Sequence, residues 1–268
     1  MDGGGTMPAG FYEVLSGQLH CETAGAGTPV VFLHGFGLDL RMWESQAAAL
    51  ADHFLVIRYD MRGYGRSSLP TADSYSHADD LAALLGHLGV ESAHVVGLSA
   101  GGRNALRFAL AFPQCVRSLT LADSALDGYT WSAEWQAQWN AIDSQAKSGD
   151  LPGAKRMWLE HPLFSPARQQ ATVAFNLSHM VYAYSGWHWI NVDPGRAPDM
   201  PAINGLANVR ARTLVIIGEK DLPDFQHIAD TLVSGIPGAA RVVIPGSGHM
   251  TNMEAPAAFN DALLGFLA

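Results

Sequence analysis

The chain has 268 residues, of which 48% are hydrophobic and 15% charged, and this balance excludes a disordered, collagen-like or coiled-coil protein. The formal net charge is −9 and no run of Lys and Arg is present, which argues against binding to nucleic acid or to an anionic membrane surface. Two cysteines, Cys21 and Cys115, are too few for a disulfide framework, so a reducing, cytoplasmic location is expected.

No targeting or membrane-spanning segment is predicted. The first ten residues, MDGGGTMPAG, contain no basic residue and no apolar run of the kind found in signal peptides. No stretch reaches the roughly 18 consecutive apolar residues that a transmembrane helix needs. The length fits one large domain that carries an insertion, and the sequence holds no signal of oligomeric state.

Short apolar runs alternate with helical patterns along most of the chain. A hairpin is expected at 11–23, ahead of strands at 30–33, 54–59, 93–98, 116–122, 213–217 and 241–244. Helices are expected at 40–51, 75–88, 100–112, 225–235 and 255–267. Continuous β-branched runs suit parallel strands that are buried on both faces. The pattern therefore predicts an α/β fold with a mostly parallel central sheet flanked by helices.

The alternation stops between the fourth and fifth of these strands. Residues 125–205 contain no strand-like run and hold six of the seven tryptophans, so they are expected to form a helical cap on a core made of 1–124 and 206–268. Some of these rings are expected either to pack the cap onto the core or to line a substrate pocket beneath it. The candidates for the pocket are Trp131, Trp135, Trp158 and Trp187.

The segment Gly97-Leu98-Ser99-Ala100-Gly101-Gly102 lies between a predicted strand and a predicted helix. A GxSxG sequence in that context is typical of a nucleophile elbow, in which a sharp turn exposes the serine hydroxyl above the sheet. Small residues at 97 and 101 leave room for that turn. Ser99 is therefore the candidate nucleophile.

A serine hydroxyl needs a base, and the base needs an acid to orient it. His249 follows the last predicted strand in a glycine-rich loop, and it comes after the serine in the chain order that this type of site requires. Asp221, directly past the strand at 213–217, is the favoured acid. Glu219, Asp224 and Asp123 remain as rival acids.

A tetrahedral intermediate needs backbone N–H donors for its oxyanion. Ala100, directly after the nucleophile, is expected to supply one of them. Phe36 is expected to supply the other, by analogy with the corresponding lipase loop, and the neighbouring His34 and Gly35 are expected to lie against the substrate.

The motifs HGFG at 34–37, DMRGYGRS at 60–67, GLSAGG at 97–102, GEKD at 218–221 and GSGHM at 246–250 occur in one order along the chain. In this order and spacing, the chain resembles the α/β-hydrolase fold superfamily, and within it the enol-lactonase and carboxylesterase branch with a helical cap. The resemblance implies hydrolysis of a small-molecule ester or lactone, without a cofactor, through an acyl-enzyme intermediate. An apolar or aromatic part of the substrate would suit the tryptophan-rich cap.

Other activities remain open on the same residues. One is hydrolysis of a carbon–carbon bond in a β-diketone-like ring-cleavage product, and others are acyl transfer and ligand binding without catalysis. No HExxH, GxxxxGK[ST] or strand-linked GxGxxG motif is present, so neither a metal nor a nucleotide cofactor is predicted. Arg103, one helical turn past the serine, could bind a substrate carboxylate, but a solvated helix face is the favoured interpretation.

Overall fold

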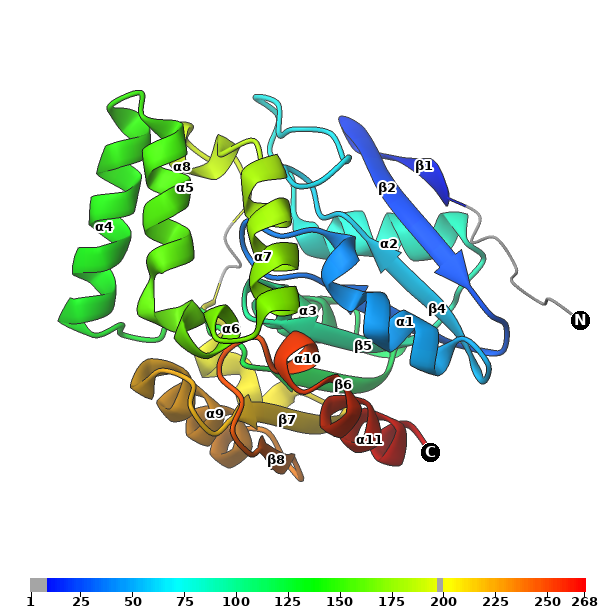
Figure 1. Ribbon diagram of the computed structural model, residues 1–268. Helices are drawn as coiled ribbons and strands as arrows, with labels where there is room; N and C mark the ends of the chain where they lie inside the picture. The colour runs from blue at the N-terminus through cyan, green and yellow to red at the C-terminus, as the bar shows by residue number, and fades with distance from the viewer. Residues whose placement is uncertain (1–8, 197–199) are drawn as a thin grey trace, which may run out of the picture.

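A computed structural model describes residues 9–196 and 200–268, which form one eight-stranded sheet in the order β1-β2-β4-β3-β5-β6-β7-β8 (Figure 1). The strands are β1 (Ala9–Val14), β2 (Gly17–Ala24), β3 (Thr28–Leu33), β4 (Phe54–Tyr59), β5 (Ala93–Leu98), β6 (Val116–Ala122), β7 (Arg212–Gly218) and β8 (Ala240–Ile244). The expectation that no signal peptide is present concerns mainly residues 1–8, which lie outside the described part. No helix in the described ranges is both long enough and apolar enough to span a membrane.

The sheet is parallel from β4 to β8 and antiparallel only at one edge. β1 pairs antiparallel with β2, and β2 pairs antiparallel with β4, whereas every other neighbouring pair is parallel. The predicted edge hairpin and mostly parallel sheet are therefore confirmed. Because the strands from β3 onward run in one direction, the loops that follow β3, β5, β6, β7 and β8 all emerge at the same edge of the sheet.

Helices cover both faces of the sheet. α1 and α11 contact each other beside β4 and β8, while α2 contacts α3, and α3 packs on β3, β5 and β6 (Figure 1). The helices of the core are α1 (Glu44–Leu50), α2 (His77–His87), α3 (Ala100–Ala111), α9 (Pro223–Gly235), α10 (Thr251–Glu254) and α11 (Pro256–Leu267). Short 3-10 helices are η1 (Leu40–Trp43), η2 (Pro113–Cys115), η3 (Pro162–Phe164) and η4 (Ala202–Asn208).

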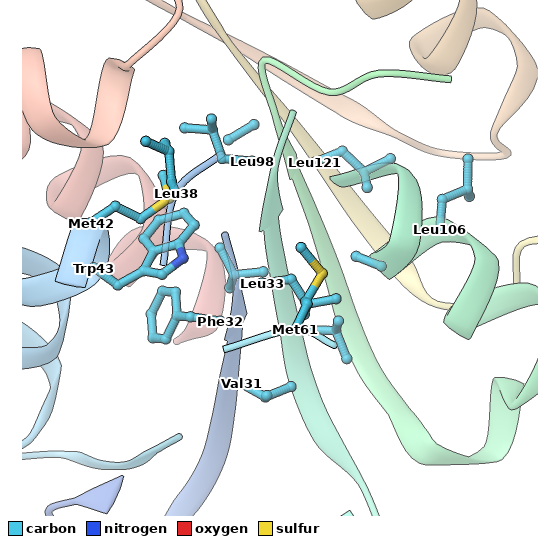
Figure 2. Close-up of a cluster of buried hydrophobic side chains, with 14 of the residues drawn as sticks. Val31, Phe32, Leu33, Leu38, Met42, Trp43, Met61, Leu98, Leu106 and Leu121 are labelled. Carbon is cyan, nitrogen blue, oxygen red and sulfur yellow. The ribbon is translucent and has the colours of Figure 1, made fainter. Parts of the chain in front are cut away.

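A cluster of buried hydrophobic side chains lies where β3 and β5 meet the loops that follow β3 and β4 (Figure 2). Val31, Phe32 and Leu33 have no exposed surface, and the Phe32 ring lies 4.9 Å from that of Trp43 (Figure 2). Full burial of each such side chain contributes about 1.5–3 kcal/mol. This packing holds the carboxyl ends of β3 and β5 rigidly side by side, and both candidate catalytic loops begin there.

Among the described residues between β6 and β7, five α-helices accompany η3 and η4, and α4 and α5 pack side by side at one end of the molecule (Figure 1). They are α4 (Ala133–Lys147), α5 (Leu151–Glu160), α6 (Ser165–Arg168), α7 (Ala171–Ala183) and α8 (Trp187–Ile190). Trp131 precedes α4, because the Ser132 hydroxyl accepts a hydrogen bond from the Trp135 N–H and so caps the helix there. The Trp131 and Trp135 rings nevertheless stack, with centroids 4.6 Å apart.

Candidate active site

Ser99 occupies a strained turn between β5 and α3. Its φ of 59° and ψ of −119° fall in a region that costs a residue with a side chain about 1–3 kcal/mol. Three backbone hydrogen bonds hold this conformation: the Ser99 N–H donates to Ala122 O, and the Ser99 carbonyl accepts from the N–H groups of Arg103 and Ala125. Hydrogen bonds from the end of β6 and the segment after it, and from α3, therefore hold Ser99 in its strained conformation.

The glycines on either side of Ser99 allow β5 and α3 to come this close. A Cβ on Gly97 would lie 2.5 Å from the carbonyl carbon of Gly101, and a Cβ on Gly101 would lie 2.6 Å from the His34 carbonyl oxygen. Real Cβ atoms essentially never approach backbone so closely. Gly97 and Gly101 are therefore needed both for the sharp turn and because a larger side chain at either position would collide with backbone atoms.

His249 and Asp221 form a buried pair beside Ser99. The His249 Nδ1 and the Asp221 Oδ2 are 2.9 Å apart, and the two side chains are 2% and 0% exposed. The His249 Nε2 is buried and has no hydrogen-bond partner in the described part of the chain. Ser99 and His249 line the same narrow cavity. The unpaired Nε2 therefore belongs to a histidine next to the candidate nucleophile.

Burial sets the protonation of this pair. It lowers the pKa of His249 to about 4, against 6.5 for an ordinary histidine, and it raises the pKa of Asp221. A neutral imidazole that donates its Nδ1 proton to Asp221 leaves Nε2 as an acceptor. The pair is thus poised to accept a proton at neutral pH.

The three rival acids have other partners. Glu219 accepts the Gly246 N–H at 2.7 Å, and Asp224 accepts the hydroxyls of Ser132 at 2.6 Å and Tyr129 at 3.0 Å. Asp123 is the nearest rival, because its carboxylate lies within 4.8 Å of the ligand atoms of both members of the buried pair.

Asp123 is fully buried behind the pair, where it accepts the Gly218 N–H at 2.8 Å and the Thr251 hydroxyl. Burial, and then the charge of Asp221, raises the pKa of Asp123 well above its usual range. Two carboxyl groups in one dry cluster favour a single shared negative charge. Asp123, Asp221 and His249 are the one group of acidic and histidine side chains within the described ranges that lie close enough together to hold a metal ion. Each of the three already makes a hydrogen bond to another residue, so no metal is needed to explain their arrangement.

The loop after β3 and the start of α3 bring one backbone N–H group each, from Phe36 and Ala100, to the same cavity. Neither the Phe36 N–H nor the Ala100 N–H donates to another group among the described residues, and both residues line one cavity with Ser99. Gly35 is adjacent, since a Cβ there would lie 3.7 Å from that of Ser99. His34 lies outside this cavity. Its buried ring accepts the Met61 N–H at Nε2 and donates from Nδ1 to the Gly35 carbonyl, and both hydrogen bonds are 2.9 Å long. It holds the loop in place.

A cavity of about 450 Å³ opens above Ser99. Three of the four candidate tryptophans, Trp131, Trp135 and Trp158, line it, whereas Trp187 does not and instead packs its ring against that of His188, 5.0 Å away. The remaining lining residues are Phe36, Tyr64, His77, Ala100, Arg103, Ala125, Gln136, Trp139, Asn140, His188, Asp193 and Phe225.

Several of these lining residues were not predicted from the sequence. Trp139 has the same spacing of four as Trp135, and Phe36 was considered only for its backbone, although its ring lies 5.0 Å from that of Trp139. Arg103 lines the cavity together with Ser99, and its side chain is still 36% exposed, so the face of α3 that carries it is partly solvated. Its position in the first turn of the helix that starts directly after Ser99 was the signal that could have placed it at the cavity.

Comparisons with known proteins agree with this fold. The family model described as the alpha/beta hydrolase fold matches residues 28–256. A protein of Azorhizobium caulinodans named as a carbamate hydrolase (RutD) is 30% identical over 93% of this chain and 94% of its own, and 3-oxoadipate enol-lactonase 2 of Acinetobacter baylyi is 27% identical over 94% and 95%.

A solved structure of similar shape is a thermophilic esterase from Thermogutta terrifontis with malate bound. It is 27% identical, covers 98% of both chains and has a TM-score of 0.82. The match to the family model, which spans most of the chain, confirms the resemblance to enol-lactonases and carboxylesterases that the motifs indicated. The chain therefore belongs to the α/β-hydrolase family and is a hydrolase.

Proposed function

We propose that this hydrolase cleaves a carboxylic ester or lactone, with Ser99 as nucleophile, His249 as general base and acid, and Asp221 as the residue that orients the imidazole. The observation that carries the proposal is the 2.9 Å contact of Asp221 with His249 in a buried pair beside Ser99. Acyl transfer by a serine requires a base beside the nucleophile and an acid that orients the base, and the shared cavity of Ser99 and His249 and the Asp221–His249 contact support these roles.

The reaction has two halves. The Ser99 Oγ attacks the carbonyl carbon while its proton passes to the His249 Nε2, and the resulting oxyanion accepts hydrogen bonds from the N–H groups of Phe36 and Ala100. Collapse of this intermediate breaks the carbon–oxygen bond, the imidazolium gives its proton to the leaving alkoxide, and the acyl group remains on Ser99. Water then attacks the acyl-enzyme with the same histidine as base, which releases the acid and restores the hydroxyl.

The energetic contributions follow from the environment of each group. Loss of one oxyanion donor costs typically about 3–4 kcal/mol in the transition state. Asp221 lies in a site closed to water, where its charge stabilises the transient imidazolium more strongly than it could in solvent. Asp123, with its raised pKa, is proposed to carry the proton shared by the two carboxyl groups, so that Asp221 can remain ionised.

The walls of the cavity favour a substrate with an apolar or aromatic part. The stacked rings of Trp131 and Trp135 and the edge of Trp158 offer large flat contacts, and aromatic contacts bind by area burial. We propose that 125–205 act as a cap that supplies this wall, on a core of 1–124 and 206–268. The esterase and enol-lactonase names of the relatives support the same substrate class.

A fluorophosphonate probe tests the nucleophile, and a substrate panel tests the reaction. The wild-type protein should be labelled, Ser99→Ala should not, and Ser45→Ala, which changes an exposed serine of α1, should be labelled like the wild type. A panel of aryl esters and lactones should be hydrolysed with the same dependence on Ser99. Labelling of Ser99→Ala at the wild-type rate would refute the assignment.

The same preparation separates the other activities open to this site. A β-diketone-like substrate cleaved in preference to every ester would point to carbon–carbon bond hydrolysis. Transfer of the acyl group to an added alcohol, at the expense of hydrolysis, would point to acyl transfer. Labelling at Ser99 without turnover of any substrate would point to a binding protein.

A further inference from the structure

Arg103 places a cation in the cavity that contains Ser99. It lies on α3 four residues after Ser99, and both residues line the cavity with Tyr64 and Trp139. Ser99 itself precedes the helix, so what relates the two residues is the shared cavity of about 450 Å³ and not a helical spacing. A cation is therefore held within the length of a small substrate from the serine hydroxyl.

The charge of Arg103 is poorly compensated by the protein. Its nearest carboxylate oxygen is Asp127 Oδ1, 3.9 Å from Nε, which is beyond hydrogen-bond distance. Both oxygens of Asp127 are bonded to Arg107, one of them at 2.8 Å from Nη2. The Arg103 Nε is buried and has no hydrogen-bond partner within the described residues. The Arg103 side chain as a whole is 36% exposed, and burial of its inner part together with the neighbouring Arg107 lowers its pKa.

Asp193, the one carboxylate among the lining residues, also has other partners. Its Oδ1 accepts the Gly195 N–H at 2.8 Å, and its Oδ2 lies 4.0 Å from His188 Nε2. An arginine left without a bidentate partner in a largely aromatic cavity is suited to a carboxylate, because the guanidinium fork matches the two carboxylate oxygens.

We propose that Arg103 binds a carboxylate of the substrate, so that the preferred ester or lactone is an anion whose carboxylate lies several bonds from the scissile carbonyl. This inference rests on the proposed function of Ser99. The whole chain carries a net charge of −9 and repels anions at long range, so a preference for an anionic substrate must arise locally, at a residue such as Arg103.

The test compares matched anionic and neutral esters. Monophenyl adipate and phenyl 6-methylheptanoate place the charge, or an uncharged group of the same shape, at the end of the acyl chain. The esters 4-carboxyphenyl butyrate and 4-isopropylphenyl butyrate place it on the leaving alcohol. The variants are Arg103→Gln, Arg103→Lys and, as a control for loss of one positive charge elsewhere, Arg117→Gln at the exposed start of β6.

The wild-type enzyme should have a higher kcat/KM for the anionic ester in at least one pair. Arg103→Gln should lower that value by about 10- to 100-fold, the cost of one charge-assisted hydrogen-bonded contact, and should leave the neutral ester within about threefold. Arg103→Lys should keep part of the preference because it keeps the charge without the fork. Arg117→Gln should match the wild type on both esters.

Two results would overturn the inference: no anionic preference in either pair, or equal losses on both members of a pair in Arg103→Gln. Absence of turnover of all four esters would instead refute the proposed function. In that case, titration of the tryptophan fluorescence with 4-phenylbutyrate and with 4-phenylbutanol still decides on Arg103. Binding of the acid that weakens about tenfold in Arg103→Gln, with unchanged binding of the alcohol, supports the site, and any other pattern contradicts it.

Discussion

Substitution of Gly101 by alanine tests the geometry of the elbow directly. The added methyl group would lie 2.6 Å from His34 O, about 0.8 Å short of the 3.4 Å at which ordinary contact begins, and closer still to Leu33 O. Both atoms are backbone, so relief requires a shift of α3 away from β3. Such overpacking costs about 3 kcal/mol, which for a domain of this size corresponds to a fall in Tm of about 5–10 °C.

The same shift should harm catalysis more than stability, because it separates Ser99 on α3 from the Phe36 loop that follows β3. We expect kcat to fall by about 100-fold on an aryl ester at a temperature where the variant is fully folded. Gly86→Ala is the matched control: this exposed glycine in α2 has no atom within 4 Å of a new Cβ, so alanine there should stabilise by about 0.5–1 kcal/mol and leave kcat unchanged. Wild-type Tm and kcat in Gly101→Ala would refute the contact between α3 and β3 described above.

Three further outcomes are expected. Burial lowers the pKa of His249 to about 4, and only the neutral imidazole accepts the serine proton, so kcat/KM should fall on acidification with an apparent pKa below 6.5. An acidic fall in kcat/KM with an apparent pKa at or above 6.5 would contradict this. Asp221→Asn should lower kcat by about 10⁴-fold and Asp123→Asn by less than about tenfold, whereas the reverse order in steady-state kinetics would make Asp123 the orienting acid. Trp158→Ala should lower the free energy of unfolding by about 3–5 kcal/mol, because this ring is 3% exposed and packs edge-on against the rings of Phe36 and Phe164. A urea titration measures this loss, and a loss under about 1 kcal/mol would show that the proposed cap is not fixed by this contact.

The strands and the elbow were predictable because their signals are local. A buried parallel strand is mostly apolar, and a polar residue directly follows the last apolar residues of β5 and β6, at Ser99 and Asp123. The parallel order then brings the loops after β3, β5, β7 and β8 to one edge of the sheet. Asp221 and His249 are 28 residues apart in the sequence, and their contact follows from the position of both loops at that edge. No long-range sequence signal is needed to predict it.

The lining of the cavity was not predictable in the same way. Trp139 and Trp187 belong to the same tryptophan-rich segment, yet one ring faces the cavity and the other packs beside His188, since the cap helices can rotate about their axes without changing the sequence pattern. Arg103 is ambiguous for a related reason: the solvated face of a helix and a face covered by a distant insertion carry the same residue types. The tryptophans at and around α4 and α5 that line the cavity with Arg103 decide between them, and the sequence does not place them there.

The loop after β7 links the proposed chemistry to the proposed cap. Asp221 holds His249, while Asp224, three residues later, binds the Ser132 hydroxyl at the N-terminus of α4. Ser132 lies between Trp131 and Trp135, the stacked pair on the cavity wall. Part-buried hydrogen bonds therefore connect the aromatic wall of the cavity to the same short loop that carries Asp221, the proposed orienting acid.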